Sequence, residues 1–92
     1  MTWSKGKYVF GEVKSDMGTL AAAILIPEYI PHVSIRNCFE EIYSAGFFHV
    51  GDDFKVNVYG RSEGLQVDSR PEDAKEIAKV LLIGPDYGRG EE

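Results

Sequence analysis

Apolar and polar side chains alternate along several short segments of this chain, the pattern of β-strands. Residues 54–59 alternate most strictly, which predicts a strand with one buried face. A weaker alternation over residues 7–13 contains Gly11, which indicates a bulge or a close backbone approach. Residues 19–26 are apolar at nearly every position, which predicts a central strand covered on both faces. Two further short strands are predicted at residues 47–50 and 65–68.

Two other segments follow the helical period. The first begins at Ser34, whose hydroxyl can cap free N–H groups, and Gly46 stands where a left-handed C-terminal cap would lie. Its apolar face consists of Ile35, Cys38, Phe39, Ile42 and Ala45. The second follows Ser69, and Glu72 three residues later completes a capping box. Its apolar stripe consists of Ala74, Ile77, Ala78, Leu81 and Leu82.

Two turns of similar chemistry divide the chain. Residues 14–18 (KSDMG) and 61–64 (RSEG) each combine a basic residue, a serine, an acid and a glycine. The element order is therefore ββα–βββα. We expect an α+β two-layer sandwich, with a mostly antiparallel sheet of about five strands and two helices on one face. The opposite sheet face would be partly open.

The predicted domain covers residues 7–85, between a loose arm (1–6) and a flexible acidic tail (86–92). Trp3 in the arm either folds back onto the core or anchors a partner. With 92 residues and 43% hydrophobic content, the chain is long enough for one globular domain. The N-terminus does not resemble a signal peptide, and the longest apolar run, residues 20–26, is too short to span a bilayer. We expect a cytoplasmic protein, in the host cytoplasm if it is viral.

The sequence contains few groups that could perform catalysis. His32 and His49 have no metal-ligand spacing with one another or with Cys38, and a single cysteine forms no intramolecular disulfide. Cys38 lies on the apolar stripe of the first predicted helix, so we expect it in the core. The paired carboxylates have structural explanations in turns and in a first helical turn. We therefore expect no enzyme activity, no metal and no cofactor.

The distribution of charge is more informative than any motif. The net charge of −5 argues against general nucleic-acid binding, although a local basic patch remains compatible with it. Two surfaces are candidates for a partner. The acidic face of the predicted helices carries Glu40, Glu41, Glu72, Asp73 and Glu76. The open sheet face carries Tyr8, Lys55, Asn57, Tyr59 and Arg61, and Phe10 could join it.

In its size, acidity and lack of catalytic motifs, the chain resembles phage and mobile-element accessory proteins, including anti-CRISPR inhibitors. The resemblance rests on class and not on a shared motif. It implies a non-enzymatic protein-binding module that covers a surface of a larger nucleoprotein complex. Two alternatives stay open: a nucleic-acid-contacting domain that uses Lys55, Tyr59 and Arg61, and a structural homodimer built through the sheet edge or the open face.

Overall fold

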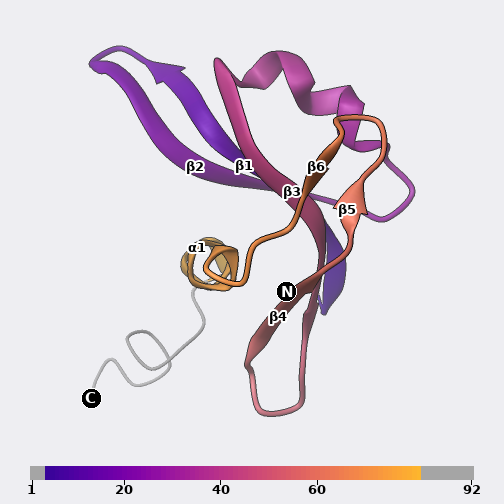
Figure 1. Ribbon diagram of the computed structural model, residues 1–92. Coiled ribbons are helices and arrows are strands. Elements are labelled where there is room, and N and C mark those ends of the chain that lie inside the picture. The colour runs from indigo at the N-terminus through magenta and orange to yellow at the C-terminus, as the bar shows by residue number, and fades with distance from the viewer. Residues whose placement is uncertain (1–3, 82–92) are drawn as a thin grey trace, which may run out of the picture.

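The structure is a computed structural model, and it describes residues 4–81. Four strands form an antiparallel sheet in the order β2-β1-β3-β4 (Figure 1). Their bounds are β1 (Lys5–Ser15), β2 (Gly18–Ile26), β3 (Glu41–Val50) and β4 (Val56–Tyr59). The other elements are a hairpin of β5 (Arg61–Ser62) and β6 (Val67–Asp68), a 3-10 helix η1 (His32–Cys38) and an α-helix α1 (Asp73–Leu81). The predicted α+β class with a mostly antiparallel sheet is confirmed.

One face of the sheet packs against α1 and holds the main core. Tyr8 and Phe10 from β1, Phe48 from β3 and Ile77 from α1 form its centre. Half-buried side chains from β2, β3, β4 and α1 surround them: Ala23, Leu25, Tyr43, Val50, Val56, Val58 and Leu81. Full burial of one such large apolar side chain contributes roughly 1.5–3 kcal/mol. The apolar stripe predicted for the second helix therefore does face the sheet.

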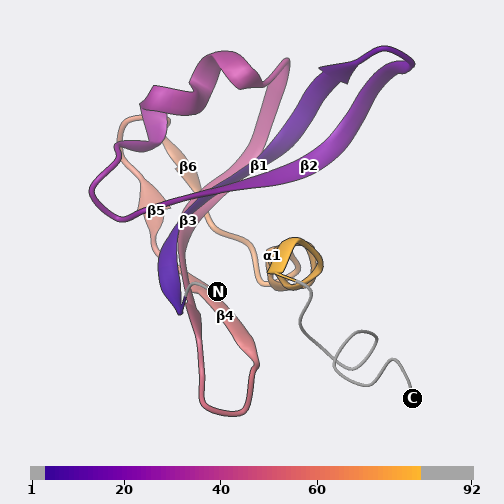
Figure 2. The same cartoon turned by 180° about the vertical axis from the view of Figure 1, so that it is seen from behind.

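The opposite face of the sheet is covered in part by η1 and by the β5–β6 hairpin (Figure 2). Val9 and Ala45, which alternate with the core residues of β1 and β3, are completely buried there. His32 of η1 packs edge-on against Phe47, with 5.6 Å between ring centroids. Because Phe47 and Phe48 point to opposite faces, η1 and α1 lie on opposite sides of the sheet, and the prediction of two helices on one face is wrong.

The prediction of a first helix from Ser34 is also wrong. The segment that it would occupy is divided between η1 and the first half of β3. Ser34 lies within η1 and caps nothing with its side chain, and Gly46 is a strand residue. The error has a physical cause: β3 is a central strand with buried residues on both faces, so its apolar pattern does not alternate and also fits a helical period.

The predicted place of the second strand is wrong for the converse reason. Its apolar run predicted a central strand, yet β2 is the edge strand of the sheet. Residues 18–21 are exposed, and only Ile26 at the other end is buried. The β1–β2 hairpin extends beyond the rest of the sheet, and its tip stands clear in both views (Figures 1 and 2).

Gly11 is at the irregularity that its sequence predicted. The β1–β3 register shifts between Phe10 and Gly11, where Tyr43 is the extra residue of the bulge. A Cβ on Gly11 would lie 2.1 Å from the Glu41 carbonyl oxygen, so a side chain has no room there. The bulge redirects the start of β3, which carries the carboxylates of the candidate site.

The start of α1 is fixed by Asp73 and not by the predicted capping box of Ser69 and Glu72. The Asp73 carboxylate is buried and accepts the Arg70 backbone N–H at 3.0 Å. It also accepts the Tyr8 hydroxyl at 2.5 Å and the Arg70 guanidinium at 3.1 Å. The Arg70 guanidinium in turn lies over the Phe10 ring, 5.5 Å from its centroid. This group of contacts attaches α1 to the middle of β1.

Some predictions fall outside the described residues, namely those on Trp3, on Leu82 and on the acidic tail. The strand predicted from Phe54 begins at Val56, because Phe54 has a positive φ of 62° in the preceding turn. No helix within residues 4–81 is long and apolar enough to cross a membrane.

Candidate binding surfaces

Three glutamates, Glu12, Glu40 and Glu41, lie at the end of the β1–β3 ladder beyond the bulge. Glu12 and Glu41 are register partners in the antiparallel ladder. The Glu40 backbone N–H donates to the Glu12 carbonyl oxygen at 2.7 Å. Like charges directly opposite one another on a sheet are destabilising. Repulsion between these carboxylates costs stability, and a cationic partner would relieve it. This end of the ladder is therefore a candidate binding surface.

Tyr43, the bulge residue, relieves part of this repulsion. Its hydroxyl donates a hydrogen bond to the Glu12 carboxylate. That bond, with burial and the charges of Glu12 and Glu41 adding to it, raises the pKa of Tyr43 to about 12. Glu12 is thereby held in place, whereas neither Glu40 nor Glu41 forms an ion pair within residues 4–81.

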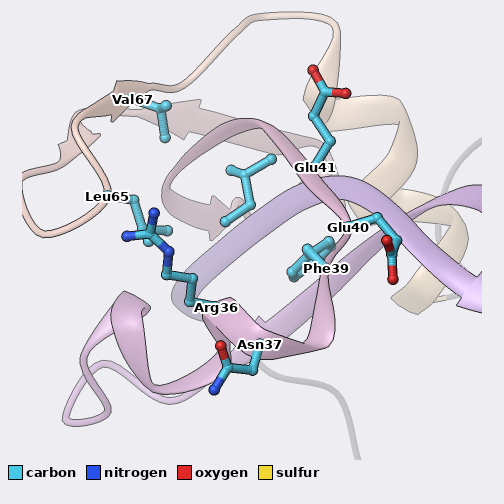
Figure 3. Close-up of a pocket in the computed structure, with 8 residues that line it drawn as sticks. Arg36, Asn37, Phe39, Glu40, Glu41, Leu65 and Val67 are labelled. Atoms are coloured by element: carbon cyan, nitrogen blue, oxygen red, sulfur yellow. The ribbon is translucent and has the colours of Figure 1, made fainter.

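Glu40 and Glu41 border a cleft of about 330 Å³, which we call the acidic cleft. Its lining residues are Arg36, Asn37, Phe39, Glu40, Glu41, Ile42, Leu65 and Val67. Figure 3 shows Arg36 beside Leu65 at one side and the two glutamates at the other. Their carboxylates point in different directions, so each would meet a different cation. Four of the lining residues are apolar, and we call them the apolar floor: Phe39, Ile42, Leu65 and Val67. The charged lining residues Arg36, Glu40 and Glu41 are exposed.

The other predicted acidic residues do not join this surface. Asp73 is only 1% exposed and serves the start of α1, so it is unavailable to a partner. Glu72 pairs with Arg70 at 3.9 Å and Glu76 with Lys79 at 3.6 Å. In both views, α1 is well separated from the start of β3 (Figures 1 and 2). The predicted acidic face is therefore two separate surfaces. Of its five residues, only Glu40 and Glu41 form no ion pair within residues 4–81.

Tyr8, the first residue of the predicted sheet-face site, does not lie on the open face. Tyr8 is completely buried beneath α1, where burial and the bond to Asp73 raise the pKa of its hydroxyl strongly. Phe10 packs beside it. Tyr8 and Phe10 therefore lie on the face that α1 covers, and the prediction that they belong to the open face is wrong. Lys55 and Asn57 are exposed, as predicted for the outer side of this strand.

Tyr59 is 50% exposed and belongs to an aromatic patch on the face opposite α1. We define the aromatic patch as His32, Phe47 and Tyr59. Phe47 and Tyr59 stack at 5.7 Å, and the Lys7 ammonium lies 5.9 Å from the Phe47 centroid. A neighbouring pocket of about 270 Å³ is lined by Lys7, Pro31, His32, Val33, Phe47, Arg61, Ser62, Glu63 and Gly64.

The positive charges beside the aromatic patch are already engaged. The Arg61 guanidinium is 3.3 Å from the Asp68 carboxylate and 3.9 Å from that of Glu63. The Lys7 ammonium donates to the Ile30 carbonyl oxygen at 3.0 Å. Phosphate binding at this pocket would have to displace these partners, which lowers its attraction for nucleic acid.

The three residues considered for metal binding or nucleophilic chemistry are His32, Cys38 and His49, and their environments differ. His32 is buried, its Nε2 lies 2.8 Å from the Gly46 carbonyl oxygen, and burial lowers its pKa. Cys38 is exposed, so the expectation of a core cysteine is wrong. His49 is also exposed. Residues 4–81 contain no cluster of three or more His, Cys, Asp or Glu side chains arranged to hold a metal ion.

The apolar floor of the acidic cleft and two members of the aromatic patch, His32 and Phe47, are functional candidates that the sequence pattern did not indicate. Ile42 and Phe39 were assigned to a helix face, and Phe47 to a strand without a stated direction. The signal that could have found them is the β-branched and aromatic content of residues 41–50, which favours a strand over a helix. Pairing that strand with β1 would then have placed Glu12 opposite Glu41.

No protein-family model, curated protein or solved structure matches this chain.

Proposed function

We propose that this protein is a non-enzymatic protein-binding module that uses the acidic cleft to occupy a basic surface of its partner. The observation that carries the proposal is the position of Glu40 and Glu41. Both carboxylates are exposed, both lack an ion-pair partner within residues 4–81, and both stand at the rim of an apolar floor.

The chemistry of the cleft suits lysine and arginine side chains. Their alkyl stems can pack on Ile42, Phe39 and Leu65, while their charged heads remain at the rim near the glutamates. Arginine fits better than lysine, because its planar guanidinium is weakly hydrated and can bond a carboxylate through two N–H groups. Arg36 at the far side would meet a carbonyl or carboxylate of the partner, which would fix the direction of binding.

The partner class follows from the same electrostatics. A chain of net charge −5 is attracted over a distance to strongly basic surfaces, so its association would be fast and sensitive to salt. Surfaces of that kind on proteins are most often those that bind nucleic acid. With the resemblance to anti-CRISPR inhibitors, this supports a role in blocking the nucleic-acid-binding surface of a larger nucleoprotein complex.

A calorimetric titration with a short arginine-rich peptide tests the cleft directly. The double variant Glu40→Gln/Glu41→Gln should bind about five- to tenfold more weakly, as expected for the loss of two exposed charge pairs. The matched control is Asp16→Asn/Asp52→Asn, which changes the net charge equally at two exposed turns. Equal weakening in both variants would show that only net charge matters and would overturn the assignment of the cleft.

Inhibition requires its own experiment. The protein should prevent a CRISPR-type effector complex from binding its DNA target in a gel-shift assay, and Glu40→Lys/Glu41→Lys should abolish the effect. The protein should leave the DNA itself unbound. Direct binding of the DNA by the protein would contradict the inhibitor role and favour the second candidate.

The second candidate is nucleic-acid contact through the aromatic patch. The observation in its favour is the exposed Tyr59 ring stacked on Phe47, because such rings can stack bases of single strands. It predicts that Tyr59→Ala and Arg61→Ala weaken the binding of single-stranded RNA or DNA, while Asn57→Ala has little effect. Absence of binding by the native protein at low salt would exclude it.

A further inference from the structure

The outer edge of β2 is unusually open for a long edge strand. β2 has nine residues and contains neither a charged residue nor a proline, and within residues 4–81 it pairs with β1 alone. Because hydrogen bonds in an antiparallel ladder alternate in direction, about half of its N–H and C=O groups point away from β1. Natural proteins normally protect such edges with charges, prolines, bulges or a covering segment.

The other edge of the same sheet is protected in this way. β4 has only four residues, Lys55 precedes it, and the polar Asn57 is exposed along it. The difference between the two edges within one small sheet indicates that β2 is an edge kept available for pairing. Exposed apolar side chains on and beside β2 support this interpretation: Leu20 is 50% exposed, Tyr29 83% and Met17 96%.

We propose that β2 pairs antiparallel with β2 of a second copy of this chain, so that two sheets join into one across a two-fold axis. Such an interface is isologous, which means that the same surface must complement itself. Within Gly18–Ile26 it does so because a strand without charges places no like charges opposite one another, although each copy carries a net charge of −5. Acidic residues flank the strand at Asp16 and Glu28, outside the paired segment.

The sequence of β2 also selects a register. Ala22 is the midpoint of Gly18–Ile26, so an axis through Ala22 pairs the strand along its full length. Leu20 then lies opposite Ile24 of the second copy, and the small Ala21 opposite Ala23. One position beyond the strand, Met17 lies opposite Pro27 of the second copy. Leu20 and Met17 would thus gain apolar neighbours across the interface, and both α1 helices would lie on the same face.

The test is sedimentation equilibrium of the full chain under reducing conditions, because Cys38 is exposed. The native protein should dimerise. Ala21→Lys, a change at an exposed edge position, should weaken the dimer at least about tenfold by placing charge at the pairing edge. The control Asn57→Lys carries the same charge on the β4 edge and should leave the dimer intact. A strictly monomeric native protein, or a dimer sensitive only to Asn57→Lys, would overturn the proposal.

A disulfide test fixes the register and does not depend on the tolerance of lysine. In a Cys38→Ser background, Ala22→Cys should cross-link across the two-fold axis, whereas Leu20→Cys should not, since its two copies are offset along the strands. Equal cross-linking of both variants would contradict the register. The proposal goes beyond the acidic cleft: if β2 forms the dimer, monomeric Ala21→Lys should still bind the arginine-rich peptide, so failure of either proposal leaves the other standing.

Discussion

The hydroxyl of Tyr8 offers a clean measurement of the contact that attaches α1 to the sheet. Tyr8→Phe keeps the ring in the core and removes only the oxygen that donates to Asp73 at 2.5 Å. Both residues are buried, so no water replaces the lost bond. A hydrogen bond to a charged group contributes about 1.5–3 kcal/mol. Asp73 retains three bonds from Arg70, so we expect a loss near the middle of that range, about 2 kcal/mol.

Urea denaturation followed by circular dichroism should show this loss as a lower midpoint with an unchanged slope. For a domain of this size, the melting temperature should fall by about 8–16 °C. The control is Tyr29→Phe, whose side chain is 83% exposed and which should change stability by less than about 0.5 kcal/mol. A loss of stability for Tyr8→Phe as small as that for Tyr29→Phe would contradict a stabilising bond between Tyr8 and Asp73. A double-mutant cycle with Asp73→Asn should give a coupling free energy above about 1 kcal/mol.

Three further measurements test the fold. Gly11→Ala should destabilise the protein by more than about 2 kcal/mol in urea denaturation, because its Cβ would meet the Glu41 carbonyl oxygen at 2.1 Å; native-like stability would contradict the bulge. Gly46→Ala should behave similarly, with its Cβ 2.7 Å from the Tyr59 carbonyl oxygen, and an unchanged midpoint would refute this packing. The contribution of Tyr43 to stability should be constant below pH 10 and be lost as pH rises toward 12, because the folded pKa of Tyr43 lies above its ordinary value of 10.0; the raised pKa of Tyr8 acts in the same direction. Tyr43→Phe should reduce that alkaline loss, and an unaltered pH profile would exclude Tyr43 as its source.

Elements with one buried face could be predicted from the sequence, whereas strands with apolar residues on both faces could not. α1 has one buried face, and its apolar stripe around Ile77 was read correctly. The turn at Ser15 was also recognisable, and its hydroxyl donates to the Gly18 carbonyl oxygen at 2.8 Å. β3 was predicted as a helix because apolar residues on both of its faces hide the strand period. β2 was predicted as a central strand because an apolar run does not distinguish a central strand from an unprotected edge.

The candidate site was less predictable than the fold. Glu40 and Glu41 were identified from charge alone, whereas the floor beneath them depends on residues from η1, β3 and the β5–β6 hairpin. Only the β1–β3 register brings Glu12 to the same end of the sheet. Asp73 shows the converse: an acid in a first helical turn has a general explanation, but its burial against Tyr8 is a tertiary contact without a local signal.

The acidic cleft is tested most directly by nuclear magnetic resonance during titration with the arginine-rich peptide. The largest amide shifts should occur at Glu40, Glu41 and Ile42, with a second group at Leu65 across the cleft. These shifts should shrink as salt is raised from about 50 to 300 mM. Shifts confined to Phe47 and Tyr59, or shifts spread evenly over all exposed carboxylates, would contradict binding at the acidic cleft.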